Sequence, residues 1–318
     1  MNSNSMAIAV LCSHLCMGEG IKPLEPKEWG TLAQRMYAAD IQPSDILTYD
    51  IQQLCDAFQM NELQAERIMR LLDRSGSLSF ELSKYENMGI QVLTRADEGY
   101  PAILKKKLGN SCPPLFYAAG NLELLKHESV GYVGSRTISD GDMAVTREFV
   151  RKTAGRGYAV VSGGAKGVDQ ISQEEALDLG GCAISYVADS MLRKIKNSKT
   201  VYAIQQGKLL MLSIVNPDAG FNAGIAMMRN KYIYAQSSGT VVIKSDYNKG
   251  GTWTGAMENL KNNWCPTFCW NHTAYKGNKE LISNGAIPID QDWDGDITEQ
   301  KKTVPKIECE QISMFDNL

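Results

Sequence analysis

The sequence predicts an α/β protein with a Rossmann-like, doubly wound and mostly parallel sheet, preceded by a small helical domain. From Ser129 onward, short apolar runs alternate with helix-length segments, a rhythm typical of a parallel sheet covered by helices on both faces. Within residues 1–80, apolar residues instead recur at helical spacings, among them Leu54, Phe58, Ile68, Leu71 and Leu72.

Five apolar or β-branched runs are the expected strands: Val130–Val133, Tyr158–Val161, Ala183–Val187, Leu209–Ile214 and Thr240–Ile243. The expected helices lie between and after them: Asp142–Ala154, Val168–Leu179, Asn222–Ala235 and Trp253–Asn262. We therefore expect a helical domain over residues 1–85 that resembles SAM or helix-hairpin-helix domains, and a Rossmann-like domain over residues 126–290. Between them we expect a loop-rich connector over residues 86–125, in which Ile90–Leu93 is strand-like, and after them an acidic flexible tail over residues 291–318.

The charge of the chain is unevenly distributed. The net charge is −3, but the stretch from Lys126 to Lys261 holds 17 basic and 12 acidic residues. The middle thus carries about +5 and the remainder about −8. This distribution fits a phosphate-binding surface, but it also fits solvent-exposed charges that are unevenly distributed and bind nothing. No apolar run is long enough for a membrane span, no signal peptide is recognisable, and the eight cysteines are scattered. We expect a cytoplasmic protein with free thiols and no membrane association.

Two glycine-rich turns follow successive expected strands. The first turn contains Gly134, Ser135 and Arg136, and the second contains Ser162, Gly163, Gly164, Lys166 and Gly167. Glycine lets a phosphate approach the backbone, the amides of a helix N-terminus attract anions, and arginine adds a bidentate donor. Two such turns in successive βα units predict a shared anion site, although neither is a Walker A sequence or a dinucleotide fingerprint.

Two further segments add candidate phosphate contacts. The first contains Arg229, Asn230 and Lys231 within an otherwise apolar, helix-like stretch, where a cation needs an anion or a carboxylate as partner. Of the neighbouring aromatic residues, Tyr232 and Tyr234 are expected in the core, although they and Phe221 could stack on bases. The other segment, which contains Lys249, Gly250, Gly251 and Thr252, follows the strand Thr240–Ile243 and opens a helix.

These four blocks, in this order, resemble the pattern of the DNA-processing protein A family. That pattern runs Gly-Ser-Arg, then Ser-Gly-Leu-Ala-x-Gly-Ile-Asp, then Arg-Asn-Arg-Ile-Ile, then Ser-Gly-Ser-x-x-Thr-Ala. Upstream, Tyr100-Pro101 and Pro113–Tyr117 also resemble the family, so the resemblance covers roughly residues 45–290. The chain departs from the pattern at Gly164, Gln173, Lys231 and residues 189–197 and 251–254, as expected of a divergent branch.

The resemblance implies a protein that binds single-stranded DNA, protects it and loads a RecA-type recombinase, often as a homodimer, with no cofactor and no enzymatic activity. The wider superfamily also contains lysine-decarboxylase-like, cytokinin-activating phosphoribohydrolases, whose Pro-Gly-Gly-x-Gly-Thr-x-x-Glu motif is partly similar to Gly250–Glu258. A nucleotide-hydrolysing enzyme with Glu258 as acid and Arg229 as phosphate clamp is therefore the alternative. A nucleotide-sensing anti-phage defence protein on the same fold is a third possibility.

Two short motifs lie outside these blocks. Gln311, Ile312, Ser313, Met314 and Phe315 resemble the pentapeptide that binds the bacterial sliding clamp, and the alternative is an amphipathic segment that packs on its own domain. Cys265, Cys269 and His272 have the spacing of half a metal site, but no second pair completes it. We expect buried thiols there and no metal.

Overall fold

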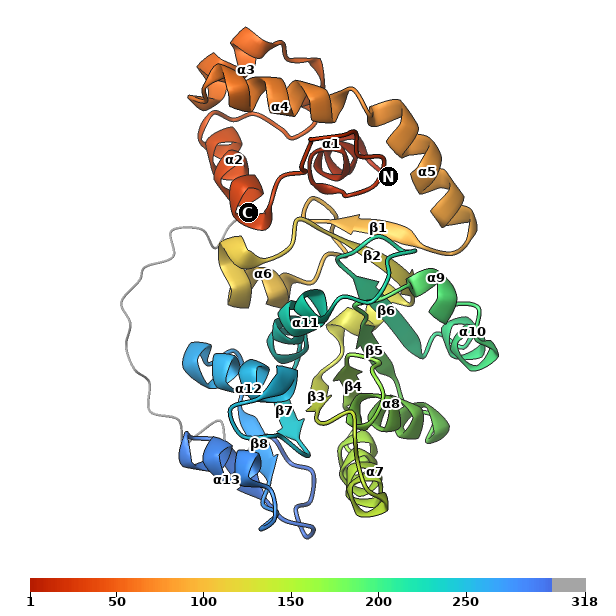
Figure 1. Cartoon of the computed structure of the whole chain (residues 1–318). Helices are drawn as coiled ribbons and strands as arrows, with labels where there is room; N and C mark the ends of the chain where they lie inside the picture. Colours follow the sequence, from red (N-terminus) through yellow and green to blue (C-terminus); the bar gives the residue numbers. More distant parts are fainter. Residues whose placement is uncertain (299–318) are drawn as a thin grey trace.

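The structure, a computed structural model, describes residues 1–298 and confirms the predicted α/β class (Figure 1). Within these residues nine strands form one sheet in the order β1-β2-β6-β5-β4-β3-β7-β8-β9. The strands are β1 (Gln91–Thr94), β2 (Leu115–Gly120), β3 (Ser129–Val133), β4 (Ala159–Ser162), β5 (Ala183–Tyr186), β6 (Leu209–Ser213), β7 (Gly239–Val242), β8 (Thr267–Trp270) and β9 (Ile287–Ile289). All neighbours from β6 to β9 are parallel, whereas β1 and β2 are antiparallel additions beside β6.

The direction in which the chain adds strands reverses at β3. From β3 the chain continues through β4, β5 and β6 on one side, and then returns to place β7, β8 and β9 on the other side. In an open α/β sheet, such a reversal leaves a crevice at the carboxyl ends of the central strands, where ligands bind.

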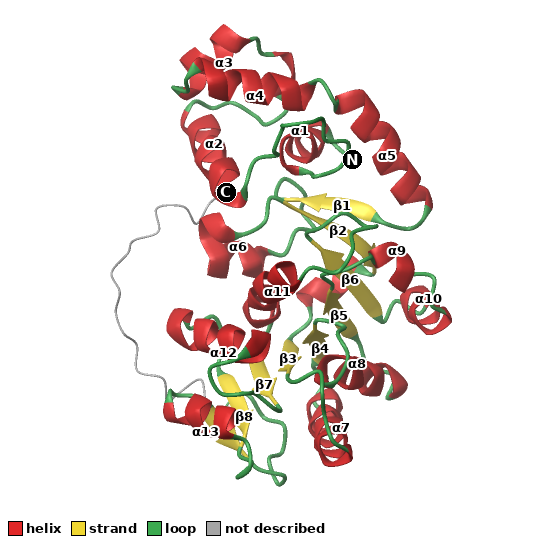
Figure 2. Cartoon of the chain, in the orientation of Figure 1, coloured by secondary structure: helices red, strands yellow, loops and turns green. Residues whose placement is uncertain are grey.

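Helices cover both faces of the sheet, as Figure 2 shows. One face packs against α6 (Ala102–Leu108), α11 (Ala223–Gln236), α12 (Gly250–Asn262) and α13 (Lys276–Ser283). The opposite face packs against α7 (Asp140–Gly155) and α8 (Val168–Asp178), and further along the sheet against α9 (Met191–Lys194), α10 (Ser198–Gln205) and the N-terminal helices. Short 3₁₀ helices span Asp45–Thr48, Gly109–Ser111 and Leu122–Lys126.

The N-terminal helical region shares a core with the sheet. Its helices are α1 (Ser3–Cys12), α2 (Pro26–Ala38), α3 (Ile51–Phe58), α4 (Glu62–Leu72) and α5 (Ser75–Asn87). Side chains alternate along a strand, so β2 directs Phe116 toward α6 and α11 but Leu115 and Tyr117 toward the N-terminal helices. The Tyr117 hydroxyl lies 2.8 Å from Ser13 Oγ, directly after α1.

Two predicted boundaries differ from the structure. The segment 86–125, expected as a connector, contributes β1 and β2 to the sheet. The flexible tail expected from residue 291 is wrong for residues 291–298, which pack on α7. There Ile297 is fully buried, Trp293 stacks on Phe268, and Arg156 pairs with Asp294. The many acidic residues of this segment predicted an exposed tail, but the apolar side chains of Trp293 and Ile297 pack it against the domain.

No helix among residues 1–298 is both long and apolar enough to cross a membrane.

Candidate nucleic-acid interface

A cavity of about 400 Å³ lies at the strand reversal. Its walls come from the turn after β3, the turn after β4, the segment between β7 and α12, and the first half of α11. The residues that line it include Gly134, Ser135, Arg136, Asp169, Arg229, Asn230, Lys244, Asp246, Lys249, Gly250, Gly251 and Thr252. The structure thus brings residues from all four predicted segments to one place.

The turns after β3 and β4 interlock, and two glycines make this possible. Gly167 has a φ of +85°, and a Cβ there would lie 2.3 Å from the carbonyl oxygen of Ser135. A Cβ on Gly134 would lie 2.5 Å from Val168 Cγ2. The Val168 amide donates to the Ser135 carbonyl at 3.3 Å, and the Ser135 amide donates to the Lys244 carbonyl at 2.9 Å. The backbone of the cavity is therefore a connected unit.

Arg229 is the buried cation of the site, with 5% of its surface exposed. It lies across the second turn, because a Cβ on Gly163 would sit 1.0 Å from its Nη1. Its carboxylate partner is Asp169, with 3.5 Å between Nη1 and Oδ2. The Nε and Nη1 groups are buried and make no hydrogen bond to any described residue. Such donors are costly to leave unmet, so the site has capacity for an anionic ligand.

Burial and pairing act in opposite directions on these two groups. Burial lowers the pKa of Arg229, and the Asp169 carboxylate partly offsets this. Burial raises the pKa of Asp169, against the effects of Arg229 and of the amides of Ala165 and Gly163. Asp169 therefore supports Arg229 without saturating its donors.

The third turn is fixed by Asn230. Its Nδ2 donates to the carbonyl oxygen of Gly251 at 3.0 Å, which ties α11 to the start of α12. Gly250 has a φ of +79°, and the first turn of α12 opens into the cavity beside the exposed Lys249. Amides at a helix N-terminus attract phosphate groups.

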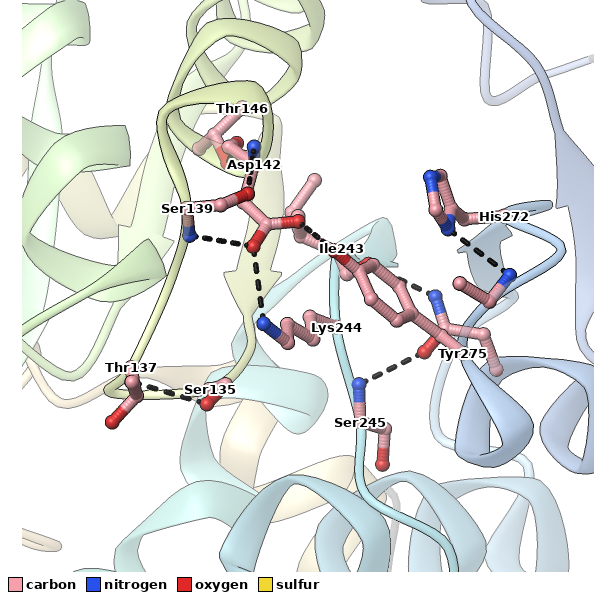
Figure 3. Close-up of polar contacts among 12 residues, drawn as sticks. Ser135, Thr137, Ser139, Asp142, Thr146, Ile243, Lys244, Ser245, His272 and Tyr275 are labelled. Carbon is pink, nitrogen blue, oxygen red and sulfur yellow. Dashed lines mark hydrogen bonds and ion pairs between the residues drawn. The ribbon is translucent and has the colours of Figure 1, made fainter.

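Lys244 also lines the cavity, although the sequence prediction did not include it. Figure 3 shows its ammonium group held from behind by Asp142 of α7, with Nζ and Oδ2 3.2 Å apart. The Tyr275 hydroxyl donates to Asp142 Oδ1 at 2.5 Å, and the Ser139 amide donates to Oδ2 at 2.8 Å. Burial alone raises the pKa of Asp142, but these hydrogen bonds outweigh it and hold that pKa below its usual range. The position of Lys244, directly after the strand Thr240–Ile243, was the available signal.

Not every predicted residue faces this cavity. Ser162 is fully buried, and its hydroxyl donates to the Tyr132 carbonyl at 2.7 Å, so it joins β4 to β3. Lys231 lies over the ring of Tyr232, 5.3 Å from its centroid, and lines neither this cavity nor the larger one that adjoins it. Gly163, Gly164 and Lys166 line that larger cavity. Tyr232 and Tyr234 are core residues, as predicted.

Phe221 lines the larger cavity, beside Arg136, which lines both. It is 56% exposed, and the Arg136 guanidinium lies over its ring, 4.9 Å from the centroid. An exposed aromatic ring beside a cation is the combination that stacks on bases in proteins that bind single strands.

Comparison with known proteins identifies the family. The sequence model of the family described as DNA recombination-mediator protein A matches residues 91–300. This chain belongs to that family. DNA processing protein DprA of Bacillus subtilis is 25% identical over 171 residues, and the match covers 53% of this chain and 57% of the Bacillus protein. The chain thus spans just over half the length of that relative.

Two solved structures of the family are similar to this one. DNA processing protein A from Streptococcus pneumoniae has a TM-score of 0.71 at 19% identity, and the match covers 91% of this chain and 95% of that one. It supports the shared fold. DNA processing protein A from Helicobacter pylori has a TM-score of 0.51 at 27% identity, covering 63% of this chain and 90% of that one, and its structure was described for its mode of binding single-stranded DNA.

Three other predicted features have different outcomes. Residues Gln311–Phe315 lie outside the described residues. Glu258, the acid of the enzymatic alternative, does not line the cavity. Burial lowers the pKa of Lys231, and the negative charge of Glu258 partly offsets this effect. Cys265 and Cys269 are buried, as predicted.

Proposed function

We propose that this chain binds single-stranded DNA in the cavity at the strand reversal and serves as a recombination mediator without enzymatic activity. The observation that carries the proposal is Arg229, a buried cation that lines a crevice built from glycine-rich turns and whose Nε and Nη1 groups make no hydrogen bond within residues 1–298. Arg136, Lys244 and Lys249 add positive charge at the same opening, against the carboxylates of Asp169 and Asp246. The Helicobacter pylori relative, described as binding single-stranded DNA, supports the same ligand.

The chemistry of the cavity favours a phosphate backbone over a hydrolysed substrate. An enzyme that cleaves a nucleotide needs an acid or base within hydrogen-bond reach of the reacting atoms. Glu258, the acid that the phosphoribohydrolase-like motif would supply, lies outside the cavity lining, and of the two lining carboxylates, Asp169 and Asp246, the first is paired with Arg229. We therefore expect purified protein to release no free base from nucleoside monophosphates.

Competition binding tests the proposal. A labelled single-stranded oligonucleotide should bind, and unlabelled single strands should displace it better than duplex DNA or free nucleotides. Displacement by a free nucleotide at lower concentration would favour the nucleotide-sensing alternative. Phosphate contacts release counterions, so affinity should fall steeply as salt rises.

Substitutions locate the binding site. Arg136→Ala, Lys249→Ala and Arg229→Ala should each weaken binding about ten- to hundredfold, because a hydrogen bond to a charged group contributes about 1.5–3 kcal/mol. The loss should be the same for all base sequences, since phosphate contacts carry no base information. Arg70→Ala, which removes an exposed arginine of α4, is the matched control. Unchanged affinity in all three folded variants would remove this site assignment.

We further propose the partners that a recombination mediator requires: a RecA-type recombinase and a second copy of this chain. Pull-down of the recombinase on single-stranded DNA and measurement of mass in solution test these two interactions separately.

We also propose that Gln311–Phe315 binds the bacterial sliding clamp at about micromolar affinity, as short peptides of this size do. A truncation ending at Glu310 that binds the clamp as well as the full chain would contradict this.

A further inference from the structure

A second cavity, the lateral groove, adjoins the cavity at the strand reversal. It has a volume of about 1020 Å³ and runs between α8 on one side and α9 and α10 on the other. α8 packs on β3, β4 and β5, whereas α10 packs on β2 and β6, so a strip of the sheet lies between them. Arg136, Ala165 and Arg229 line both cavities, so the two cavities adjoin at these residues.

The lateral groove carries charged residues on both sides. Lys194 and Lys199 line the side of α9 and α10, whereas Lys208, directly before β6, extends toward the end of α8, where a Cβ on Gly180 would lie 3.4 Å from its Nζ. Glu174 and Asp178 line the side of α8, together with the amide side chains of that helix. Over the whole groove, seven basic residues face three acidic ones, and Asp189 among the latter is already paired with Arg193 and Lys194. The groove is therefore net positive, with cations on both sides.

The floor of the lateral groove is apolar. Leu209 and Met211 of β6 and Ala203 of α10 supply it, and all three are buried. Tyr202, 65% exposed, stands on the α10 side, and Phe221 lies beside Arg136, which lines both cavities. Aromatic and apolar surfaces beside basic side chains suit unpaired bases, which stack without regard to sequence.

Lys199 and Lys208 are available for an anionic ligand. Neither makes an ion pair with a carboxylate among residues 1–298. Lys194, in contrast, is held by Asp189 at 3.3 Å and donates to the Gly164 carbonyl at 3.4 Å. Lys194 thus shapes the groove, while the other two lysines supply uncompensated charge.

We propose that the lateral groove carries the continuation of the single strand whose phosphates bind at the strand reversal. Its phosphates contact Lys199 on one side of the groove and Lys208 on the other, and its bases lie over the apolar floor between them. The strand crosses from one cavity to the other past Arg136 and Phe221. This inference rests on the proposed function and adds a path and a length to it.

The shape and chemistry of the groove select this ligand. Duplex DNA keeps its bases paired inside and cannot place them on a buried floor. A free nucleotide carries its phosphates at one end, whereas the cations here extend from Arg136 and Arg229 to Lys199 and Lys208. An acidic peptide would match the cations but not the exposed rings of Phe221 and Tyr202.

The length of the oligonucleotide is the decisive variable. We compare oligothymidylates of about 4 and about 16 nucleotides, which bracket the usual site sizes of single-strand binders. In the full chain, Lys199→Glu/Lys208→Glu should weaken binding of the long oligonucleotide by about tenfold or more and leave the short one unchanged, because only the long strand reaches the groove. Lys27→Glu/Lys22→Glu, which changes exposed lysines of the N-terminal region, is the matched control and should affect neither.

A second measurement does not depend on charge reversal. In Lys199→Gln/Lys208→Gln, the salt dependence of binding should become shallower by about 0.7 per lost phosphate contact, for the long oligonucleotide only. If both lengths respond equally, or if neither responds, the lateral groove is not the path and the proposed function still stands. If wild-type protein binds neither length, the proposed function itself fails.

Discussion

Lys244 illustrates how the site depends on residues that do not line it. Lys244 lines the cavity, and its ammonium group is paired with the fully buried Asp142, which does not. Asp142 is in turn held by Ser139 in a capping box at the start of α7 and by the Tyr275 hydroxyl (Figure 3). This chain of contacts joins α7, β7 and α13, which are far apart in the sequence.

Removal of the Tyr275 hydroxyl should therefore reduce stability in a pH-dependent manner. Asp142 has a lowered pKa, so it stabilises the fold above its unfolded-state pKa, and this stabilisation is lost as pH falls through the folded-state pKa. Tyr275→Phe brings that pKa closer to its ordinary value and should lower the free energy of unfolding by about 1 kcal/mol or more at pH 7. The difference from wild type should shrink at acidic pH, below the usual pKa of an aspartate carboxyl, as Asp142 becomes protonated. Urea unfolding at the two pH values, with Tyr37→Phe as the exposed control, measures it; an equal loss at both would contradict the assigned role.

At the same scale, the sequence indicated which residues carry charge but not where each side chain points. Arg229 could be predicted to need an anionic partner because it lies in an apolar helix, and it does pair with Asp169. The same reasoning predicts an anionic partner for Lys231, two positions later on α11. Lys231 instead points to a different side of the helix and lies over Tyr232. Residues two positions apart on a helix do not share a face, so Arg229 and Lys231 cannot both point into the cavity. The sequence does not show which of them does, because that depends on which face of α11 is buried.

Among the elements, the interlocked turns after β3 and β4 are the most constrained. Gly167 combines a φ of +85° with a close approach to the Ser135 carbonyl, whereas Gly157 has a φ of +87° and no atom within 4 Å of an added Cβ. Both Gly→Ala variants incur the backbone strain of that conformation, about 1 kcal/mol or more. Only Gly167→Ala should also displace the first turn.

We expect Gly167→Ala to lose more stability than Gly157→Ala and, alone of the two, to weaken binding of single-stranded DNA. The reason is that Ser135 and Arg136 move with the displaced turn, whereas Gly157 lies at the far end of α7. Urea unfolding and oligonucleotide titration of both variants provide the measurement. Equal affinity in the two proteins would mean that the turns tolerate the shift without a functional cost.

The elements of the central sheet were predictable because their apolar runs are short and strongly alternating with helices. All five predicted strands are present within a residue or two of their expected bounds. The strands that were not predicted, β8 and β9, are only four and three residues long, and Pro288 interrupts β9, so no long β-branched run signals either of them. The antiparallel strand β2 was not predicted, because two prolines precede it and a glycine ends it. Its pairing with β6 also depends on residues almost a hundred positions away in the sequence.

For the whole molecule, the boundary expected near residue 125 does not separate two cores. One cluster of buried side chains includes Leu54 and Phe58 of α3, Tyr117 of β2 and Met211 of β6. Sequence patterns identify helices and strands but not which faces meet, so the helical region looked independent. Because it covers one face of β2 and β6, its packing should be coupled to that of the sheet.

This coupling predicts that a cavity in the N-terminal helices destabilises the sheet. Leu54→Ala removes a fully buried side chain of α3 and should cost about 2–5 kcal/mol. In a Trp29→Phe background, the remaining tryptophans, Trp253, Trp264, Trp270 and Trp293, all report on the sheet region. Their urea transition should move to lower concentration by the full amount, because the shared core unfolds as a unit. Leu63→Ala, at a 77% exposed position of the same region, is the matched control and should leave the transition in place. A sheet transition that is identical in the Leu54→Ala and Leu63→Ala proteins would show instead that the helical region unfolds on its own.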